Sequence, residues 1–171
     1  DPQPQNPLIM PGQFIPVAEK SGQIIDIDKW VLQRSIEMLA KHPQMPPVAV
    51  NISGRSFDDP SLPRFIQTQL DKHQVDPERL IIELTETAAV SDIKDAQRFI
   101  EAINQAGCKV CLDDFGSGFS TFSYLKYLGV EMLKIDGMFI RDLTNNRDNQ
   151  IFVKAMVDVA RGLGKDIVAE F

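Results

Sequence analysis

The sequence predicts an α/β fold built around a parallel sheet, and three observations support this prediction. Five short apolar runs recur along the 171 residues, and segments with helical periodicity separate them. Apolar strands that alternate with helices are typical of a parallel sheet with right-handed crossovers. The composition, with 43% hydrophobic and 25% charged residues, is ordinary for one globular domain. We therefore expect a single α/β domain over residues 1–171.

The predicted strands and helices follow one another along almost the whole chain. Strands are expected at residues 48–52, 80–86, 110–112, 132–135 and 166–170. Helices are expected at residues 27–40, 63–73, 92–106, 119–128 and 151–163, after a loop at 1–13 and a helical turn at 14–19. In the helix at 27–40, Trp30 and Met38 are among the apolar residues expected to face the core.

Polar or charged residues stand at or just past the C-terminal end of every predicted strand. They are Asn51, Glu83, Glu86, Asp113, Asp114, Lys134, Asp136 and Glu170. A (β/α)₈ barrel of the TIM type gathers its functional residues at that end of its strands. A doubly wound sheet would usually have a glycine-rich phosphate loop after its first strand, and this sequence has none there. Because a complete barrel takes roughly 250 residues, the chain is expected to hold about two-thirds of one.

The most informative stretch is residues 108–128, which read CKVCLDDFGSGFSTFSYLKYL. Its apolar start ends in two adjacent carboxylates, Asp113 and Asp114, and a loop with Gly116, Ser117 and Gly118 follows. Neighbouring carboxylates repel each other unless a cation lies between them, which indicates a hard-metal site. Taken alone, the acidic pair is better explained as a solvated turn in which an aspartate caps the next helix. The polar residues at the ends of the other predicted strands make a metal site the better explanation.

Gathered at one end of a barrel, these side chains provide the ligands for two hard divalent ions, Mg²⁺ or Mn²⁺. The candidate ligands are Asn51, Glu83, Asp113 and Asp114. Two ions about 3.5–4 Å apart activate a water and stabilise the oxygens of a phosphodiester displacement. Lys134 would neutralise charge on the phosphate, and Glu170 would take the proton of the water. Physical reasoning thus places a metal-dependent phosphoesterase ahead of an enolase-like barrel that acts on carbonyl acids.

Charge and cysteine content restrict the other classes of function. The net charge of −6 and the pI of about 4.9 argue against a nucleic-acid polymer as partner, but not against a small phosphorylated ligand. No apolar run approaches the length of a membrane span. Cys108 and Cys111 lie in a predicted strand, where residues three apart face opposite sides. We therefore expect two reduced, structural cysteines rather than a zinc site.

Six motifs follow one another along the chain: FIPVAEKSGQI, VNIS, ELTE, LDDFGSGFSTFSYL, LKID and VAE. In order and spacing they resemble the EAL-domain family of cyclic-di-GMP phosphodiesterases, which act in bacterial second-messenger signalling. The resemblance covers essentially the whole chain. It implies a TIM-type barrel that cleaves cyclic di-GMP to linear pGpG with two ions, Mg²⁺ or Mn²⁺, and that Ca²⁺ inhibits.

The resemblance also implies roles for single residues. The implied metal ligands are Asn51, Glu83, Asp113 and Asp114. Asp114 matches the aspartate that contacts the second metal, and it counts with Lys134 and Glu170 as catalytic. Lys134 matches the lysine beside the attacking water, and Glu170 matches the glutamate proposed as general base. Asp136 is implied to bind substrate.

The loop after Asp114 has its own counterpart in the family. Glu86 matches the glutamate that anchors this loop, whose residues include Gly116, Ser117 and Gly118. In the family the loop lies at a dimer interface, so the resemblance implies a homodimer. It further implies sensor or GGDEF modules elsewhere in the parent chain. The domain is expected to be cytoplasmic, with a membrane-anchored parent protein as an open alternative.

The sequence departs from the family pattern at both ends. The strand with the Glu-Ala-Leu signature, whose glutamate is a metal ligand, would precede Asp1, and the last part of the barrel would follow Glu170. We therefore expect a partial domain, truncated at both ends, that is inactive on its own. The alternative function is a catalytically inactive receptor that binds cyclic di-GMP and signals through a protein partner. The ligands retained in the chain favour the enzyme.

Overall fold

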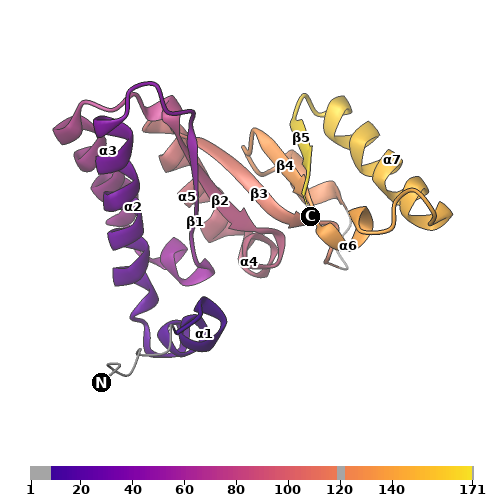
Figure 1. The fold of residues 1–171 in the computed structure, drawn as a ribbon, viewed down its shortest axis with the longest axis horizontal. Coiled ribbons are helices and arrows are strands. Elements are labelled where there is room, and N and C mark those ends of the chain that lie inside the picture. Colours follow the sequence, from indigo (N-terminus) through magenta and orange to yellow (C-terminus); the bar gives the residue numbers. More distant parts are fainter. Residues whose placement is uncertain (1–8, 119–121, 171) are drawn as a thin grey trace, which may run out of the picture.

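The structure is a computed structural model that describes residues 9–118 and 122–170. Its centre is a sheet of five parallel strands whose spatial order equals their order in the sequence (Figure 1). The strands are β1 (Val48–Asn51), β2 (Leu80–Thr85), β3 (Lys109–Phe115), β4 (Met132–Ile135) and β5 (Asp166–Ala169). A parallel sheet in which each strand pairs with its neighbours in sequence is part of a (β/α) barrel, as predicted.

Helices connect the strands, and they lie either on the outside of the sheet or near the C-terminal ends of the strands. In the described part of the chain they are α1 (Pro11–Ser21), α2 (Ile24–Lys41), α3 (Leu62–His73), α4 (Glu86–Ser91), α5 (Ile93–Gln105), α6 (Gly137–Ile140) and α7 (Arg147–Gly162), with the 3₁₀ turns η1 (Gly54–Asp58), η2 (Pro77–Arg79) and η3 (Phe122–Lys126). The long helices α2, α3, α5 and α7 cover the outside of the sheet, whereas α1, α4 and α6 lie toward the end where the strands finish (Figure 1).

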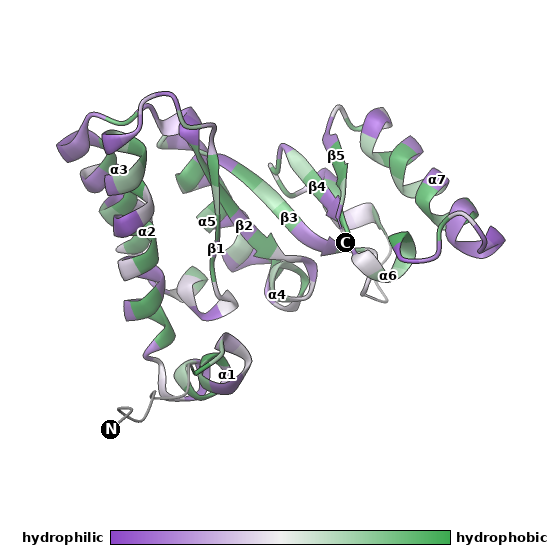
Figure 2. Ribbon diagram, in the orientation of Figure 1, coloured by the Kyte–Doolittle hydropathy of each residue, from purple (hydrophilic) through white to green (hydrophobic). Residues whose placement is uncertain are grey.

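The core lies between the sheet and the long helices, because alternate residues of each strand point to that side. Leu84, Leu112 and Leu133 occupy neighbouring register positions on β2, β3 and β4, and none has exposed surface. The helices contribute Ile36, Ile66, Ile100 and Met156 to the same cluster. In Figure 2 the middle of β3 is hydrophobic and its C-terminal arrowhead is hydrophilic, which marks the strand end that carries the acidic pair.

Two predictions about the first helices were wrong. Helix α1 begins at Pro11, inside the segment predicted as loop, because proline fits the first turn of a helix. Trp30 is 61% exposed and Met38 is 36% exposed, although both were expected to face the core. The buried stripe of α2 contains Leu32, Ile36 and Leu39. Because two residues along a helix rotate by about 200°, Trp30 faces away from Leu32.

The segments around the glycine loop also differ from the prediction. The helix expected at 119–128 is the short 3₁₀ turn η3, and Phe119 lies outside the described residues. The short helices α4 and α6 were not predicted. The Thr85 hydroxyl and the Asp136 carboxylate cap them by accepting hydrogen bonds from Ala88 N (3.3 Å) and Met138 N (2.7 Å). Among the described helices, none combines the length and apolarity that crossing a membrane requires.

Candidate metal centre

Three strands place polar side chains on the face of the sheet opposite the core. Asn51 at the end of β1 is the register partner of Glu83 on β2, and its Nδ2 donates a hydrogen bond to Glu83 Oε2 at 3.2 Å. Glu83 is only 7% exposed and Asp113 on β3 only 8%. Buried carboxylates require partners, because an isolated charge in a protein interior is costly. The end of the sheet therefore concentrates acidic oxygens that need a cation.

A distortion of β3 brings both aspartates of the acidic pair to this site. The register with β4 shifts between Leu112 and Phe115, and Asp114 has a φ of 55°. In a regular strand, adjacent side chains point to opposite faces, and a bulge changes that direction. The backbone N of Asp114 donates to Asp113 Oδ1 at 2.9 Å, which stabilises the unusual conformation. As a result, carboxylate oxygens of Asp113, Asp114 and Glu170 lie within 4.8 Å of one another.

Lys134 on β4 lies among these carboxylates. Its Nζ is 2.6 Å from Glu170 Oε2, 3.2 Å from Glu83 Oε1 and 3.3 Å from Asp113 Oδ1. Burial by itself would lower the pKa of Lys134, but the hydrogen bonds to Glu170 and Glu83 together with the charges of Glu83 and Asp113 outweigh it, and the pKa is raised. Lys134 is therefore a permanent positive charge beside three carboxylates.

The acidic neighbours of Asp114 affect the ionisation of its carboxyl. Burial raises the pKa of its carboxyl, and the negative charges of Asp113, Asp136 and Glu170 raise it further. A divalent cation bound between these groups would remove that repulsion. The donor set consists of carboxylate and amide oxygens, which Mg²⁺ and Mn²⁺ prefer. The residues present thus fit a hard divalent ion.

The two cysteines lie on opposite sides of the sheet. Cys108 belongs to the core cluster, whereas Cys111 is the register partner of Glu83 on the face that carries the site. Both are free and buried, as expected. Burial, assisted by the charge of Glu83, raises the pKa of the Cys111 thiol to about 12. Burial and the acidic neighbours of Cys111 thus favour the neutral thiol over the thiolate.

Glu86, the first residue of α4, contacts the glycine loop. Its side chain is almost fully buried, and Oε2 accepts hydrogen bonds from the backbone N atoms of Gly116 (2.9 Å) and Gly118 (3.3 Å). Oε1 accepts a hydrogen bond from the hydroxyl of Tyr124. Ser117 turns back to Asp114, because its N and Oγ both donate to Asp114 O, at 3.1 and 2.8 Å. The described part of the loop is thus connected to Glu86 on one side and to Asp114 on the other.

Asp136 was also predicted as a site residue. The Asp136 carboxylate lies near Asp114, but its Oδ1 caps α6, so part of its bonding capacity is used inside the fold.

Tyr124, which contacts Glu86, was missed as a site residue in the sequence analysis. Its signal in the sequence was weak, because a single tyrosine in an apolar segment after a glycine loop is usually a core residue.

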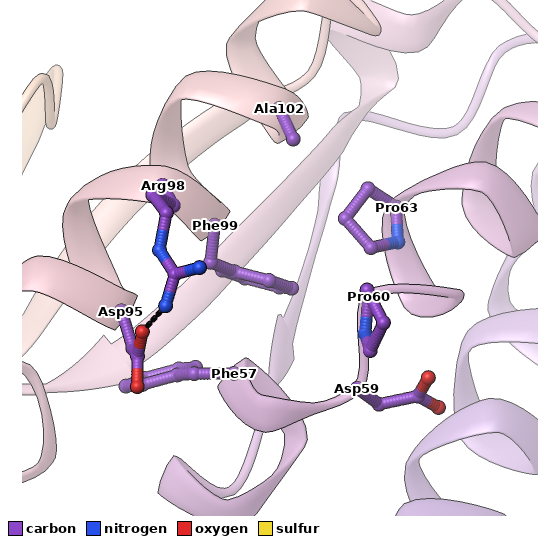
Figure 3. A pocket seen from close by; sticks show the side chains of 8 residues that line it. All are labelled: Phe57, Asp59, Pro60, Pro63, Asp95, Arg98, Phe99 and Ala102. Atoms are coloured by element: carbon purple, nitrogen blue, oxygen red, sulfur yellow. Dashed lines mark ion pairs between the residues drawn. The ribbon is translucent and has the colours of Figure 1, made fainter.

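A cavity of about 370 Å³ lies away from the acidic cluster, on the outer side of the sheet between α3 and α5 (Figure 3). It is lined by Phe57, Asp59, Pro60, Pro63, Asp95, Arg98, Phe99 and Ala102. Figure 3 shows Asp95 and Arg98 joined as an ion pair along its wall. Because none of the candidate metal ligands lines it, this cavity is separate from the centre at the strand ends.

Comparison with known proteins identifies relatives of the chain. The family model for the EAL domain matches residues 2–171. The chain is 37% identical over 172 residues to the bifunctional diguanylate cyclase/cyclic di-GMP phosphodiesterase MucR of Pseudomonas aeruginosa, covering 98% of this chain and 25% of MucR. It is 33% identical over 167 residues to the cyclic di-GMP phosphodiesterase PdeF of Escherichia coli, covering 96% and 22%. The chain therefore spans about a quarter of the length of these relatives.

Solved structures agree with this assignment. The phosphodiesterase PaMucR in complex with c-di-GMP matches with a TM-score of 0.89 and 37% identity, covering 95% of this chain and 72% of that chain. The FimX EAL domain from Pseudomonas aeruginosa bound to c-di-GMP matches with a TM-score of 0.90 and 30% identity, covering 99% and 69%. Sequence and fold thus lead to one conclusion, which confirms the resemblance seen in the motifs: the chain belongs to the EAL-domain family.

Proposed function

We propose that the protein containing this domain hydrolyses cyclic di-GMP to linear pGpG with two divalent ions, Mg²⁺ or Mn²⁺. The observation that carries the proposal is the convergence of Asp113, Asp114 and Glu170 within 4.8 Å, beside Lys134. The relatives support the choice of substrate, since PdeF is a cyclic di-GMP phosphodiesterase and the PaMucR structure holds c-di-GMP. Alternative chemistry on carbonyl acids has no comparable support.

In this mechanism the residues at the strand ends have three roles: metal binding, charge neutralisation and proton transfer. The ions would be held by Asn51, Glu83, Asp113 and Asp114. Bound there, they would supply an activated water and stabilise the oxygens of the phosphodiester. Lys134 neutralises charge that develops on the phosphate, because its ammonium group already lies among the same carboxylates. Glu170 accepts the proton of the water at Oε1, while Oε2 contacts Lys134 at 2.6 Å and orients the carboxylate.

Asp136 and the loop complete the proposed site. Asp136 lies at the rim near Asp114 and is proposed to contact the substrate. The loop with Gly116, Ser117 and Gly118 would hold Asp114 toward the second ion, with Glu86 as its anchor. A Cβ at Gly118 would stand 3.5 Å from Glu86 Cδ, an ordinary van der Waals distance, so the loop lies directly against the anchor at this residue.

We also propose a homodimer through the face next to this loop. Met138, Ile151 and Phe152 on α6 and α7 are more than half exposed, and the Phe152 ring lies 6.0 Å from that of Phe139. Exposed apolar groups gathered beside a functional loop are typical of an interaction surface. The length of the relatives supports sensor or GGDEF modules elsewhere in the parent protein. Because cyclic di-GMP is an intracellular messenger, the domain is proposed to act in the cytoplasm.

The test of the proposal is a metal-dependence experiment on the full-length protein. We expect cyclic di-GMP to be converted to pGpG with Mg²⁺ or Mn²⁺, and we expect excess chelator to stop the reaction. With Ca²⁺, calorimetry should detect binding of the dinucleotide without turnover. Product is measured by chromatography. Undiminished hydrolysis in excess chelator would contradict the metal mechanism, and binding without turnover in every metal would identify the inactive receptor instead.

The anchoring role of Glu86 gives a second prediction. In Glu86→Ala, the amides of Gly116 and Gly118 lose their acceptor, so Asp114 is no longer held toward the second ion. An interaction that organises the catalytic ions acts chiefly in the transition state, so kcat should fall far more than the affinity for cyclic di-GMP in Ca²⁺. Single-turnover cleavage and calorimetry measure the two quantities. Glu101→Ala, an exposed glutamate on α5, is the matched control. Equal and small effects on both would reject the anchor.

A further inference from the structure

The glutamate that anchors the loop has a partner of its own, Tyr124 on η3. The Tyr124 side chain is 7% exposed, and its hydroxyl donates a hydrogen bond to Oε1 of Glu86. The other oxygen, Oε2, accepts from the amides of Gly116 and Gly118. The two oxygens of one buried carboxylate therefore have different tasks in the described structure: one contacts the loop and the other contacts the tyrosine.

The direction of the hydrogen bond is fixed by the environment of the tyrosine. Burial raises the pKa of the Tyr124 hydroxyl, and the hydrogen bond and the charge of Glu86 raise it further. The phenol therefore stays protonated at every working pH and acts as donor, while the carboxylate acts as acceptor. A glutamate carboxylate rotates easily about its last torsion, since that torsion has no strong staggered preference. A donor on Oε1 removes this freedom and holds Oε2 toward the glycine amides.

The position of Tyr124 in the sequence adds a second effect. Gly116 and Gly118 lie before residues 119–121, which are outside the described part, and Tyr124 lies after them. Through one carboxylate, Glu86 thus contacts Gly116 and Tyr124, which are eight residues apart in the sequence. Ser117, which lies between the two glycines, also holds the backbone of Asp114, because its N and Oγ donate hydrogen bonds to the Asp114 carbonyl. A contiguous set of hydrogen bonds therefore connects the Tyr124 hydroxyl to the backbone of a candidate metal ligand.

We propose that Tyr124 is a positioning residue, which with Glu86 forms a clamp that holds Gly116 and Gly118 and thereby sets Asp114 for the second ion. The proposal rests on the proposed function for its effect on turnover, but not for the clamp itself. Tyr124 does not touch the reacting atoms and acts through Glu86. Loss of the Tyr124 hydroxyl should therefore make the loop less rigid and slow the metal-assisted step. The affinity for cyclic di-GMP should change little.

The experiment compares Tyr124→Phe with Tyr127→Phe in the full-length protein. Both substitutions remove one hydroxyl, but Tyr127 is 64% exposed, so it controls for the loss of the group itself. Amide hydrogen exchange of residues 113–118 measures how well the clamp protects this segment, and the measurement does not require an active enzyme. Steady-state kinetics with a Mg²⁺ titration report its effect on catalysis. All measurements are made well below the melting temperature of each variant.

For Tyr124→Phe we expect faster exchange in the peptide at 113–118, and a kcat about tenfold lower because the lost hydrogen bond involves a charged group. The KM should stay near that of the parent protein, and half-maximal activity should require more Mg²⁺. On a Glu86→Gln background, where the charge that the tyrosine orients is gone, the same substitution should have a much smaller effect. Tyr127→Phe should match the parent in every measurement.

Unchanged exchange in Tyr124→Phe would overturn the clamp, whatever happens to activity. Faster exchange with unchanged kcat in an active protein would overturn the positioning of Asp114. If the parent protein binds cyclic di-GMP without cleaving it, the proposed function fails, and the exchange measurement alone still decides whether Tyr124 helps to hold Gly116 and Gly118. A merely structural role for the tyrosine predicts a lower melting temperature with kcat, KM and the Mg²⁺ requirement all preserved.

Discussion

Replacing Asp113 by alanine is expected to lower hydrolysis of cyclic di-GMP by roughly a thousandfold, which is the scale of removing one group that stabilises a developing charge. Asp113 is buried, pairs with Lys134 at 3.3 Å and lies in the group of three carboxylates. Without it, the ions lose a ligand and Lys134 loses a partner. The melting temperature should change little, because the loss of the hydrogen bond from Asp114 N and of the contact with Lys134 opposes the relief of charge repulsion on Asp114.

The controls for this prediction separate ligation from simple loss of charge. Asp158→Ala on α7 removes an exposed carboxylate that pairs with Lys154 on the same helix, so turnover should be unchanged. Asp113→Asn keeps an oxygen that can accept from Asp114 N but loses the charge, and it should resemble the alanine variant in activity. Turnover in Asp113→Ala above a tenth of the parent value would remove Asp113 from the metal ligands. Single-turnover cleavage in Mg²⁺ gives the measurement.

Gly116→Ala is expected to destabilise the domain by about 2 kcal/mol or more and to abolish most activity. Gly116 has a φ of +96°, where a side chain is strained. A Cβ there would also lie 2.4 Å from Cε of Met156 and 3.0 Å from a ring carbon of Phe139. The Met156 methyl can shift because it ends a flexible side chain, but the Phe139 ring on α6 and the backbone strain still oppose the substitution, so the loop is expected to move. Movement of the loop would break the hydrogen bond from Gly116 N to Glu86.

The control for this second substitution is Gly162→Ala at the end of α7. A Cβ at Gly162 meets no atom within 4 Å, so the change should be neutral or stabilise the helix by up to about 1 kcal/mol. Denaturant unfolding measures both variants. Adding Met156→Ala to Gly116→Ala should recover only the part of the loss that arises from the clash, since the backbone strain remains. Wild-type stability and activity in Gly116→Ala would show that neither constraint operates.

The parallel sheet could be predicted because its strands are short apolar runs that end in polar residues. For β4, the predicted residues 132–135 are those of the observed strand. The short helices α4 and α6 could not be predicted, because they depend on single capping side chains, Thr85 and Asp136, rather than on a periodic pattern. Trp30 was misplaced because α2 has apolar residues on more than one face, and only the tertiary fold decides which of them is buried.

For the candidate site, the sequence predicted which strand ends meet but not how the side chains are oriented. Period-two alternation would place Asp113 and Asp114 on opposite faces, and only the irregular register of β3 shows that both reach the cluster. The contact between Glu86 and Tyr124 joins residues 38 positions apart in the sequence. No local pattern indicates such a pair, since the tertiary fold brings η3 and the start of α4 together.

The strand order also bears on how the protein forms during synthesis. Because every strand pairs with its neighbours in sequence, the sheet can grow as the chain leaves the ribosome, without waiting for a distant segment. Glu83, Asp113 and Asp114 emerge on β2 and β3, before the compensating charge of Lys134 on β4 and before Glu170. The nascent intermediate therefore holds unbalanced negative charge at its growing end. Addition of β4 brings Lys134 beside Glu83 and Asp113 and offsets part of that charge, so formation of these ion pairs favours docking of β4.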